Sequence, residues 1–158
     1  MDTLRLAWAA GFFDGEGSVI VELSKSPASR SGMRTSLHAT VTQTSTPCLD
    51  IFVELFGGNV KTFQHTCPNS SRWAVQYTWV VRNEKALAFL RAIQPYCVVK
   101  ASQVDAALAY PLFDAAGKKY GNPGRPIPTD VWEQRLKLRS TLQELRAGMK
   151  TKAMERPI

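Results

Sequence analysis

The feature that most restricts the fold is an alternation of apolar and polar side chains with a period of two, present in residues 18–26, 34–46 and 72–82. Because successive side chains of a strand point to opposite faces of a sheet, each segment predicts a strand with one buried face. A shorter segment, 59–65, predicts a further strand that a turn joins to the strand at 72–82. Residues 27–32 form a similar turn-rich link, so the sequence predicts two antiparallel hairpins.

Segments with helical periodicity precede, separate and follow these hairpins. The predicted helices span residues 3–13, 47–55, 83–93, 99–115 (with a kink at Pro111) and 129–147. This order predicts an α+β fold, an αββαββα core in which a four-stranded antiparallel sheet carries its helices on one face. We expect a single domain over residues 1–158, with its core at about 3–115 and C-terminal basic helices at 118–148.

Basic residues outnumber acidic ones, 20 to 13, and the net charge is +7. The excess is concentrated in residues 118–158, where ten basic residues stand against four acidic ones. Such a surplus favours an anionic partner, with nucleic acid first. No apolar run reaches the ~18 residues that a membrane span needs, and the first residues carry no secretory signal, so we expect no membrane partner.

The three cysteines, Cys48, Cys67 and Cys97, are odd in number and widely spaced. This arrangement predicts neither a disulfide framework nor a zinc site, and it fits reduced thiols in a cytosolic protein. The composition is rich in Ala and Arg and modest in Lys and Asn, as in genomes that are not AT-rich. We therefore expect a prokaryotic cytoplasmic protein, with an organelle as the alternative location.

The polar side of the predicted strands is poor in acids and rich in Arg, Ser, Thr, Gln, His and Lys. An exposed sheet face is usually solvated polar surface, and alternation alone does not distinguish that case from a binding surface. The shortage of acids and the positive net charge favour a nucleic-acid platform, because these side chains bind base edges in the major groove.

The segment Ala9–Gly17, with the sequence AAGFFDGEG, resembles the motif that names the LAGLIDADG homing endonucleases. The resemblance covers about residues 4–110 and includes Val41–Gln43, the helix end at Gln94–Pro95, and Lys100. It implies that the sheet forms a DNA-binding saddle and that the chain belongs to a mobile intron. It also implies the activity of a site-specific endonuclease, which makes metal-dependent double-strand breaks in double-stranded DNA.

The first predicted helix has two apolar faces. The larger side chains fall at i, i+4 and i+8 and form one apolar stripe: Leu4, Trp8 and Phe12. The small residues form the second face: Ala7, Ala10 and Gly11. A glycine inside a helix costs up to ~1 kcal/mol relative to alanine, and the close approach of another backbone would explain it. The family resemblance implies such an approach, because motif helices of two halves pack together there. With one motif copy, the chain is then expected to act as a homodimer on a long, roughly palindromic target.

The resemblance also implies a metal site at the end of this helix, where the family places an acidic residue. In this chain that residue is Glu16, and the backbone carbonyl of Gly15 would be a second ligand. Cutting a phosphodiester requires a hard cation, and Mg²⁺ prefers oxygen ligands; Mn²⁺ or Ca²⁺ would occupy the same site. We expect the earlier acid of the motif, Asp14, to bond locally at the helix end.

Two further catalytic positions follow from the resemblance. Gln43 matches a polar residue that helps to place water, and Lys100 matches a basic residue that stabilises charge near the scissile phosphate. A further basic position of close relatives falls at Pro47, which cannot perform that role. Outside the family context, Glu16 would be an exposed turn residue between two glycines, and the other two would be polar surface residues.

The candidates for reading bases share the polar strand faces and the adjoining turns. They are Ser24, Ser26, Arg30, Arg34, Ser36, His38, Thr40, Lys61, Arg72, Gln76 and Thr78. The candidates for contacting phosphates, which give affinity without sequence information, are Lys118, Lys119, Arg135, Lys137 and Arg139. For the last three the alternative is a solvated helix face.

Three other functions remain open at this point. An intron maturase would use the same sheet to bind RNA, and the sequence does not separate it from an endonuclease. A DNA-binding regulator on a decayed endonuclease is disfavoured by the acid retained at Glu16. A generic basic α+β binding module predicts no dependence on metal.

Overall fold

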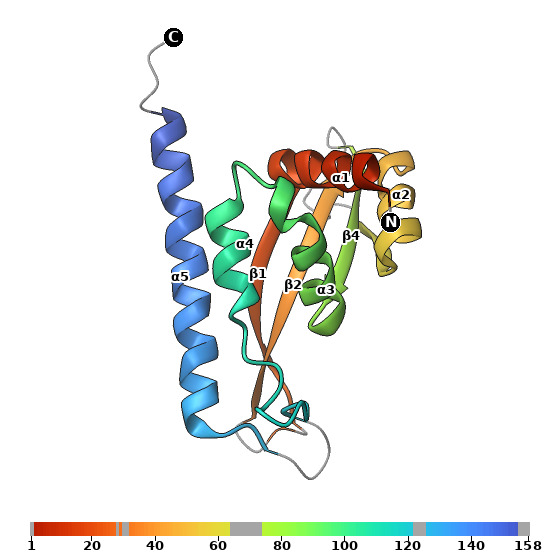
Figure 1. Ribbon diagram of the computed structural model, residues 1–158. Helices are drawn as coiled ribbons and strands as arrows, with labels where there is room; N and C mark the ends of the chain where they lie inside the picture. The colour runs from red at the N-terminus through yellow and green to blue at the C-terminus, as the bar shows by residue number, and fades with distance from the viewer. Residues whose placement is uncertain (1, 28, 30–31, 64–73, 122–125, 155–158) are drawn as a thin grey trace, which may run out of the picture.

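The computed structural model describes residues 2–27, 29, 32–63, 74–121 and 126–154 (Figure 1). Its elements in chain order are α1 (Thr3–Glu16), β1 (Gly17–Lys25), β2 (Met33–Gln43), α2 (Pro47–Phe56), β3 (Asn59–Phe63), β4 (Gln76–Arg82), α3 (Glu84–Ile93), the 3-10 helix η2 (Gln94–Tyr96), α4 (Ala101–Leu108) and α5 (Thr129–Met154). The predicted α+β order is confirmed, with a helix and a hairpin occurring twice. None of the helices in the described ranges is both long and apolar enough to span a membrane.

The four strands form one antiparallel sheet in the order β1-β2-β4-β3. β1 and β2 make the first hairpin, with Gly17 opposite Val41, and β3 and β4 make the second. The hairpins join through their inner strands, β2 and β4, where His38 lies opposite Arg82. The predicted strand positions between 64 and 73 lie outside the described residues.

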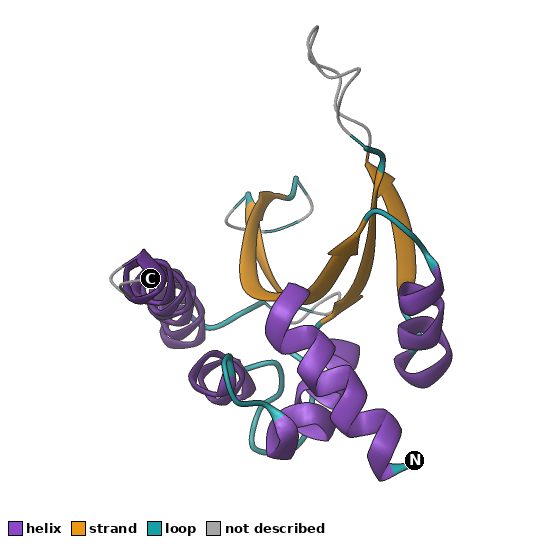
Figure 2. Cartoon of the chain, turned by 90° about the horizontal axis from the view of Figure 1, so that it is seen from above, coloured by secondary structure: helices purple, strands orange, loops and turns teal. Residues whose placement is uncertain are grey.

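Helices cover one face of the sheet and leave the other open. Figure 2 shows the sheet as a curved layer with the helices gathered on its convex side. α1 runs across one end of the strands, and α5 lies along the edge strand β1 and against α4 (Figure 1). The prediction that each alternating strand has one buried face is confirmed for β1 and β2. Their apolar side chains are buried under the helices: Val19, Val21, Leu37, Ala39 and Val41.

Aromatic rings fill the space between the sheet and the helices. The rings of Phe52 and Phe89 lie 4.9 and 5.0 Å from that of Trp79, and all three side chains are buried. The Trp79 indole nitrogen donates to the carbonyl of Gly57 at 2.7 Å, so its polar atom is satisfied inside the core. This cluster supplies the apolar burial that stabilises a chain of this size.

α1 differs from its prediction in length and in the surroundings of its small residues. It continues to Glu16 instead of ending near Phe13. Ala10, predicted at the dimer interface, is fully buried within the chain, whereas Ala7 and Gly11 of the same predicted face are exposed. In the predicted apolar stripe, Leu4 is 78% exposed and Trp8 is 39% exposed. A helix that is apolar on both sides gives no strong preference for one orientation, so packing decides it.

The prediction of a helix over residues 99–115 is also wrong for the residues after Leu108. α4 ends at Leu108, and the chain then runs through Tyr110 and Pro111 without helix. Proline lacks a backbone N–H and disfavours helix at the residue before it, which accounts for the early end. The C-terminal part holds one basic helix, α5, because the described residues from 109 to 128 carry no α-helix.

Candidate nucleic-acid interface and metal site

The end of α1 presents an acidic side chain at the rim of the sheet. α1 passes directly into β1, with Glu16 as the last helical residue and Gly17 as the first of the strand. A Cβ on Gly17 would lie 2.5 Å from the Phe13 carbonyl oxygen and would overlap the Phe13 ring, so only glycine fits this junction. Glu16 is exposed and bonds to none of the residues that the structure describes, so its carboxylate is available to a ligand.

The other acid of the motif, Asp14, is buried and ties α1 to a distant segment. Its carboxylate accepts backbone N–H groups of Val98, Val99 and Lys100 at 2.6, 3.0 and 2.9 Å. The expectation of a local bond is therefore wrong, because these partners follow Asp14 by 84 to 86 residues. Three N–H donors at the start of α4 suit a carboxylate, which acts as a cap supplied from another helix.

Lys100 takes part in the same link. Its ammonium donates to the backbone carbonyl of Asp14, and its side chain is buried. Burial lowers the pKa of Lys100, while the neighbouring charges of Asp14 and Glu16 raise it. Lys100 thus lies close enough to Glu16 for the two charges to interact. Its predicted role beside a scissile phosphate stays a prediction. The hydrogen bond of its ammonium, however, is to the backbone carbonyl of Asp14 near the end of α1.

The structure also places Gln43 at this corner of the molecule. Val41 pairs with Gly17, and Gln43 lies two residues further along β2, at the same end of the sheet as Glu16. Within the described residues, no group of three or more His, Cys, Asp and Glu residues could hold a metal ion. One exposed carboxylate and the nearby carbonyl of Gly15 offer hard oxygen ligands that suit Mg²⁺, but they make only part of a site.

The open face of the sheet carries the predicted polar residues. Strand register brings eight of the base-reading candidates onto it: Ser24, Arg34, Ser36, His38, Thr40, Lys61, Gln76 and Thr78. Ser26 follows the end of β1, and Arg30 and Arg72 lie outside the described residues. Glu22 is the only acid among the described strand residues of this face, so the face is polar and predominantly basic.

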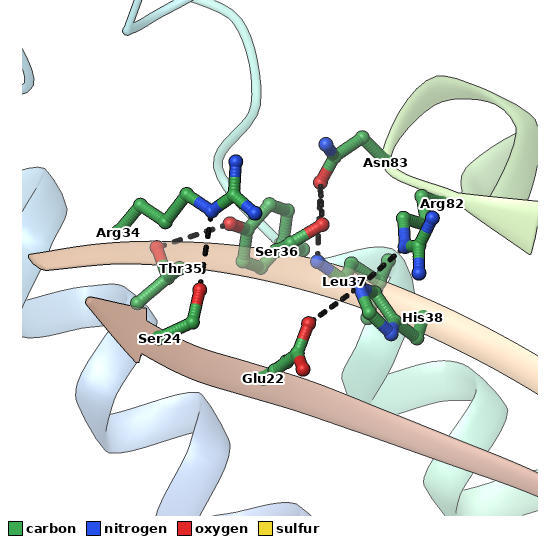
Figure 3. Close-up of polar contacts among 10 residues, drawn as sticks. Glu22, Ser24, Arg34, Thr35, Ser36, Leu37, His38, Arg82 and Asn83 are labelled. Atoms are coloured by element: carbon green, nitrogen blue, oxygen red, sulfur yellow. Dashed lines mark hydrogen bonds and ion pairs between the residues drawn. The ribbon is translucent and has the colours of Figure 1, made fainter. Parts of the chain in front are cut away.

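The polar residues on or beside this face that were not among the sequence candidates include Glu22, Arg82 and Asn83. Glu22 and Arg82 flank His38 from the neighbouring strands, and Asn83 accepts from Ser36 Oγ and the Leu37 backbone at 3.1 Å (Figure 3). The first two could have been found, because they occupy polar positions in the alternation of their strands. Asn83 could not, because its positive φ of 49° and its bonds to β2 are tertiary features.

We expect stability to depend on the protonation of His38. Burial lowers the pKa of His38 below its ordinary value of about 6.5, so the unfolded chain binds a proton at a higher pH than the folded chain. Its contribution is fully present above the unfolded pKa and is lost as the pH falls through the folded pKa. Urea unfolding between pH 7.5 and pH 5 checks this. His38→Gln should weaken the pH dependence, and an unchanged profile in that variant would contradict the assignment.

The phosphate candidates occupy different surroundings. Lys118 and Lys137 are exposed, and the ammonium of Lys119 pairs with Glu84 at 3.0 Å. Arg139 lines a cavity of about 260 Å³ between α5 and the edge strand β1, together with Arg146. These four side chains remain candidates for binding phosphates.

Arg135, the fifth phosphate candidate, is a structural residue, and that prediction is wrong. It is 2% exposed, and its guanidinium donates to the Pro111 carbonyl at 2.8 and 3.1 Å and to Thr35 Oγ1 at 3.3 Å. The guanidinium also lies 4.8 Å from the centre of the Tyr110 ring, a cation–π contact. These contacts tie α5 to β2 and to the segment after α4.

Arg135→Ala is therefore expected to lower the free energy of unfolding by about 2–4 kcal/mol, because it leaves the Pro111 carbonyl without a partner and opens a cavity. Urea denaturation measures the change. The matched control is Lys137→Ala on the exposed side of α5, where a change within about 0.5 kcal/mol is expected. Equal stability of the two variants would show that Arg135 does not hold α5 in place.

One side of α1 is apolar and uncovered. Leu4, Ala7, Trp8, Gly11 and Gly15 recur at helical spacing and are all exposed. The loop that Asp14 binds adds the exposed Val98 and Val99, which are 81% and 57% exposed, next to the end of α1. Contiguous apolar residues of this kind mark surfaces that bind a partner.

Comparison with known proteins finds solved structures with the same fold. No protein-family model matches the sequence, and no curated protein sequence matches it. The homing endonuclease I-CvuI, solved in complex with target DNA in the presence of magnesium, superposes with a TM-score of 0.67 at 18% identity, over 90% of this chain and 82% of that one.

Two further solved structures of the same fold differ in how much of their own chain is matched. The homing endonuclease I-TnaI matches with a TM-score of 0.63 at 17% identity, over 94% of this chain and 99% of that one. The LAGLIDADG homing endonuclease I-SmaMI, bound to cleaved DNA, matches with a TM-score of 0.60 at 18% identity. That alignment covers 93% of this chain but only 48% of the relative.

Proposed function

We propose that this chain, which has the fold of the LAGLIDADG homing endonucleases, is a site-specific endonuclease that cuts double-stranded DNA as a homodimer with a divalent metal. One observation carries the proposal: an exposed carboxylate, bonded to no residue that the structure describes, stands at the end of α1, at the rim of an open, predominantly basic sheet face. A solvated surface gives no reason for a face with one acid among its described strand residues. It also gives no reason for the glycine-restricted junction that presents Glu16.

The homodimer is supported by three independent features. The exposed side of α1 is apolar, and its small residues would allow two helices to approach closely. Glu16 and Gly15 make only part of a metal site, which a second copy would complete. A chain of this size also matches about half of the DNA-bound I-SmaMI, as expected if two copies form one cutting unit. The two-fold symmetry of such a dimer would require a roughly palindromic target.

The residues present fit a metal of the magnesium type. Glu16 and the Gly15 carbonyl would hold Mg²⁺, and Mn²⁺ or Ca²⁺ suits the same oxygen ligands. When bound, the metal activates water and stabilises the negative charge that develops on the phosphate oxygens. Gln43, at the same corner, would orient water. Lys100 would fix the end of α1 through its bond to Asp14 and would place a positive charge near Glu16.

The partners follow from this assignment. Double-stranded DNA would lie along the open sheet face, whose Arg34, Ser36, Thr40 and Thr78 present hydrogen-bonding groups suited to base edges. Lys118, Lys137 and Arg139 would add sequence-independent phosphate contacts. We propose a mobile intron as the genetic context and a prokaryotic cytoplasm as the location.

Incubation with a DNA pool that carries candidate insertion sites, in Mg²⁺ and in EDTA, tests the function. Discrete double-strand breaks that require the metal would support it, and sequencing of their ends would give the target. Binding of DNA without cutting in Mg²⁺, Mn²⁺ or Ca²⁺ would favour a regulator. Binding of intron RNA in preference to DNA would favour a maturase.

A further inference from the structure

Three charged or titratable side chains from three adjacent strands meet on the open face of the sheet. The Nε2 atom of His38 on β2 lies 3.1 Å from the carboxylate of Glu22 on β1. The same nitrogen accepts the Nε–H of Arg82 on β4, also at 3.1 Å. Figure 3 shows the three side chains in a row across the strands. The imidazole is buried, whereas Arg82 is exposed and the Glu22 side chain is 46% exposed.

The surroundings of His38 favour its neutral form. Burial lowers its pKa, and the positive charges of Arg82, Lys61 and Arg34 lower it further, against the opposite effect of Glu22. Because Nε2 accepts a hydrogen bond from Arg82, the ring proton is on Nδ1. A neutral ring cannot donate from Nε2 to Glu22. The neutral histidine therefore accepts from Arg82, and its Nε2 donates no hydrogen bond to the Glu22 carboxylate beside it, which can accept from a ligand.

The two outer side chains then offer a defined pair of recognition groups. Arg82 uses only Nε in the sheet, and its two terminal nitrogens donate to no residue that the structure describes. A guanidinium matches the O6 and N7 acceptors of guanine, and a carboxylate accepts from the N4 amino group of cytosine. Since both groups lie 3.1 Å from one nitrogen, they stand side by side, as the two halves of one base pair do.

We propose that Arg82 and Glu22 read one G·C base pair in the major groove of each half-site, and that His38 is the positioning residue that sets Arg82 for this contact. The inference rests on the proposed DNA-binding function. It assigns base specificity to two residues whose charges balance each other. Their role would therefore be in discrimination between sequences, while the surrounding basic residues supply general affinity.

The test uses the duplex that the wild-type chain selects from a randomised pool without magnesium, together with every single-base-pair substitution of it. At one symmetric pair of positions, replacing G·C is expected to weaken wild-type binding by about 5- to 150-fold, the discrimination of one bidentate contact. Arg82→Gln should change the preference there from G towards A, because glutamine pairs with the N6 and N7 atoms of adenine. Glu22→Gln should reduce discrimination at the same pair, because an amide can also donate.

The controls separate reading from charge and from folding. Arg91→Gln removes an equal charge from the exposed surface of α3 and should leave every base preference unchanged. His38→Phe should weaken the preference at the G·C pair, and His38→Gln, which keeps an acceptor, should largely restore it. Acidification through the pKa of His38 should weaken the same preference in the wild type, because a protonated ring donates to Glu22 and repels Arg82. This pH effect should be absent in His38→Gln.

The outcomes distinguish this inference from the proposed function. If the wild type selects no sequence, the DNA-reading function itself fails and the inference fails with it. If the wild type selects a site but Arg82→Gln and Glu22→Gln alter no preference at any position, only the inference is overturned. Changes at two unrelated positions would also overturn it, because the two side chains would then not read one pair.

Discussion

Glu16→Gln is expected to reduce DNA cleavage by more than about 100-fold. Loss of a residue that only hydrogen-bonds to a metal ligand typically costs about 10- to 100-fold in affinity or activity, and loss of the ligand itself should cost more. Glutamine keeps the length and shape of the side chain but removes the charge that a hard cation requires. The exposed side chain bonds to no described residue, so the substitution breaks no contact of the fold. Cleavage of the target in Mg²⁺, followed over time on gels, measures the effect.

DNA affinity is the internal control for this variant. Glu16 stands at the rim of the sheet and not on the reading face, so binding without metal should be retained. Glu133→Gln on α5 makes the same chemical change at another exposed acid and should cut at the wild-type rate. Cleavage by Glu16→Gln at the wild-type rate would remove Glu16 from the metal site. Joint loss of binding and cutting would instead indicate a defect in folding or assembly.

The sheet could be predicted from the sequence because its pattern is local. Which side chain of a strand faces the core depends only on parity once one apolar position is fixed, as with Val19 and Val21 in β1. The same parity assigned His38 and Thr78 to the open face without knowledge of the strand order. Glu16 and Gly15 followed from a contiguous motif.

The predictions that were wrong concern side chains whose hydrogen-bond partners are distant in sequence. Arg135 reads as a basic residue on a basic helix, but its partners Pro111 and Thr35 precede it by 24 and 100 residues. The sequence suggests that Asp14 is a local cap, but it accepts from backbone groups of the segment just before the later helix α4. In both cases the sequence pattern placed the residue on the correct helix. It could not identify the hydrogen-bond partners, because these depend on how the helices pack.

Gly11→Leu is expected to abolish dimerisation of the chain and, with it, cleavage. Gly11 lies on the exposed, apolar side of α1, and outside the backbone of its own helix no described atom lies within 4 Å of the position that a Cβ would occupy. The monomer therefore accepts leucine, and the better helix propensity stabilises it by up to ~1 kcal/mol. Two helices in close contact at this residue cannot accommodate the side chain.

Sedimentation equilibrium and urea denaturation together check this expectation, since the variant should be monomeric while its folded state remains at least as stable. Gly148→Leu is the matched control, because Gly148 is another exposed helical glycine with no atom within 4 Å of its Cβ position. It should leave assembly and cleavage unchanged. A dimeric, fully active Gly11→Leu variant would place the dimer contact elsewhere. The partial metal site at Glu16 would then require completion by a different surface, since the described residues at that corner include no group of three or more potential side-chain ligands.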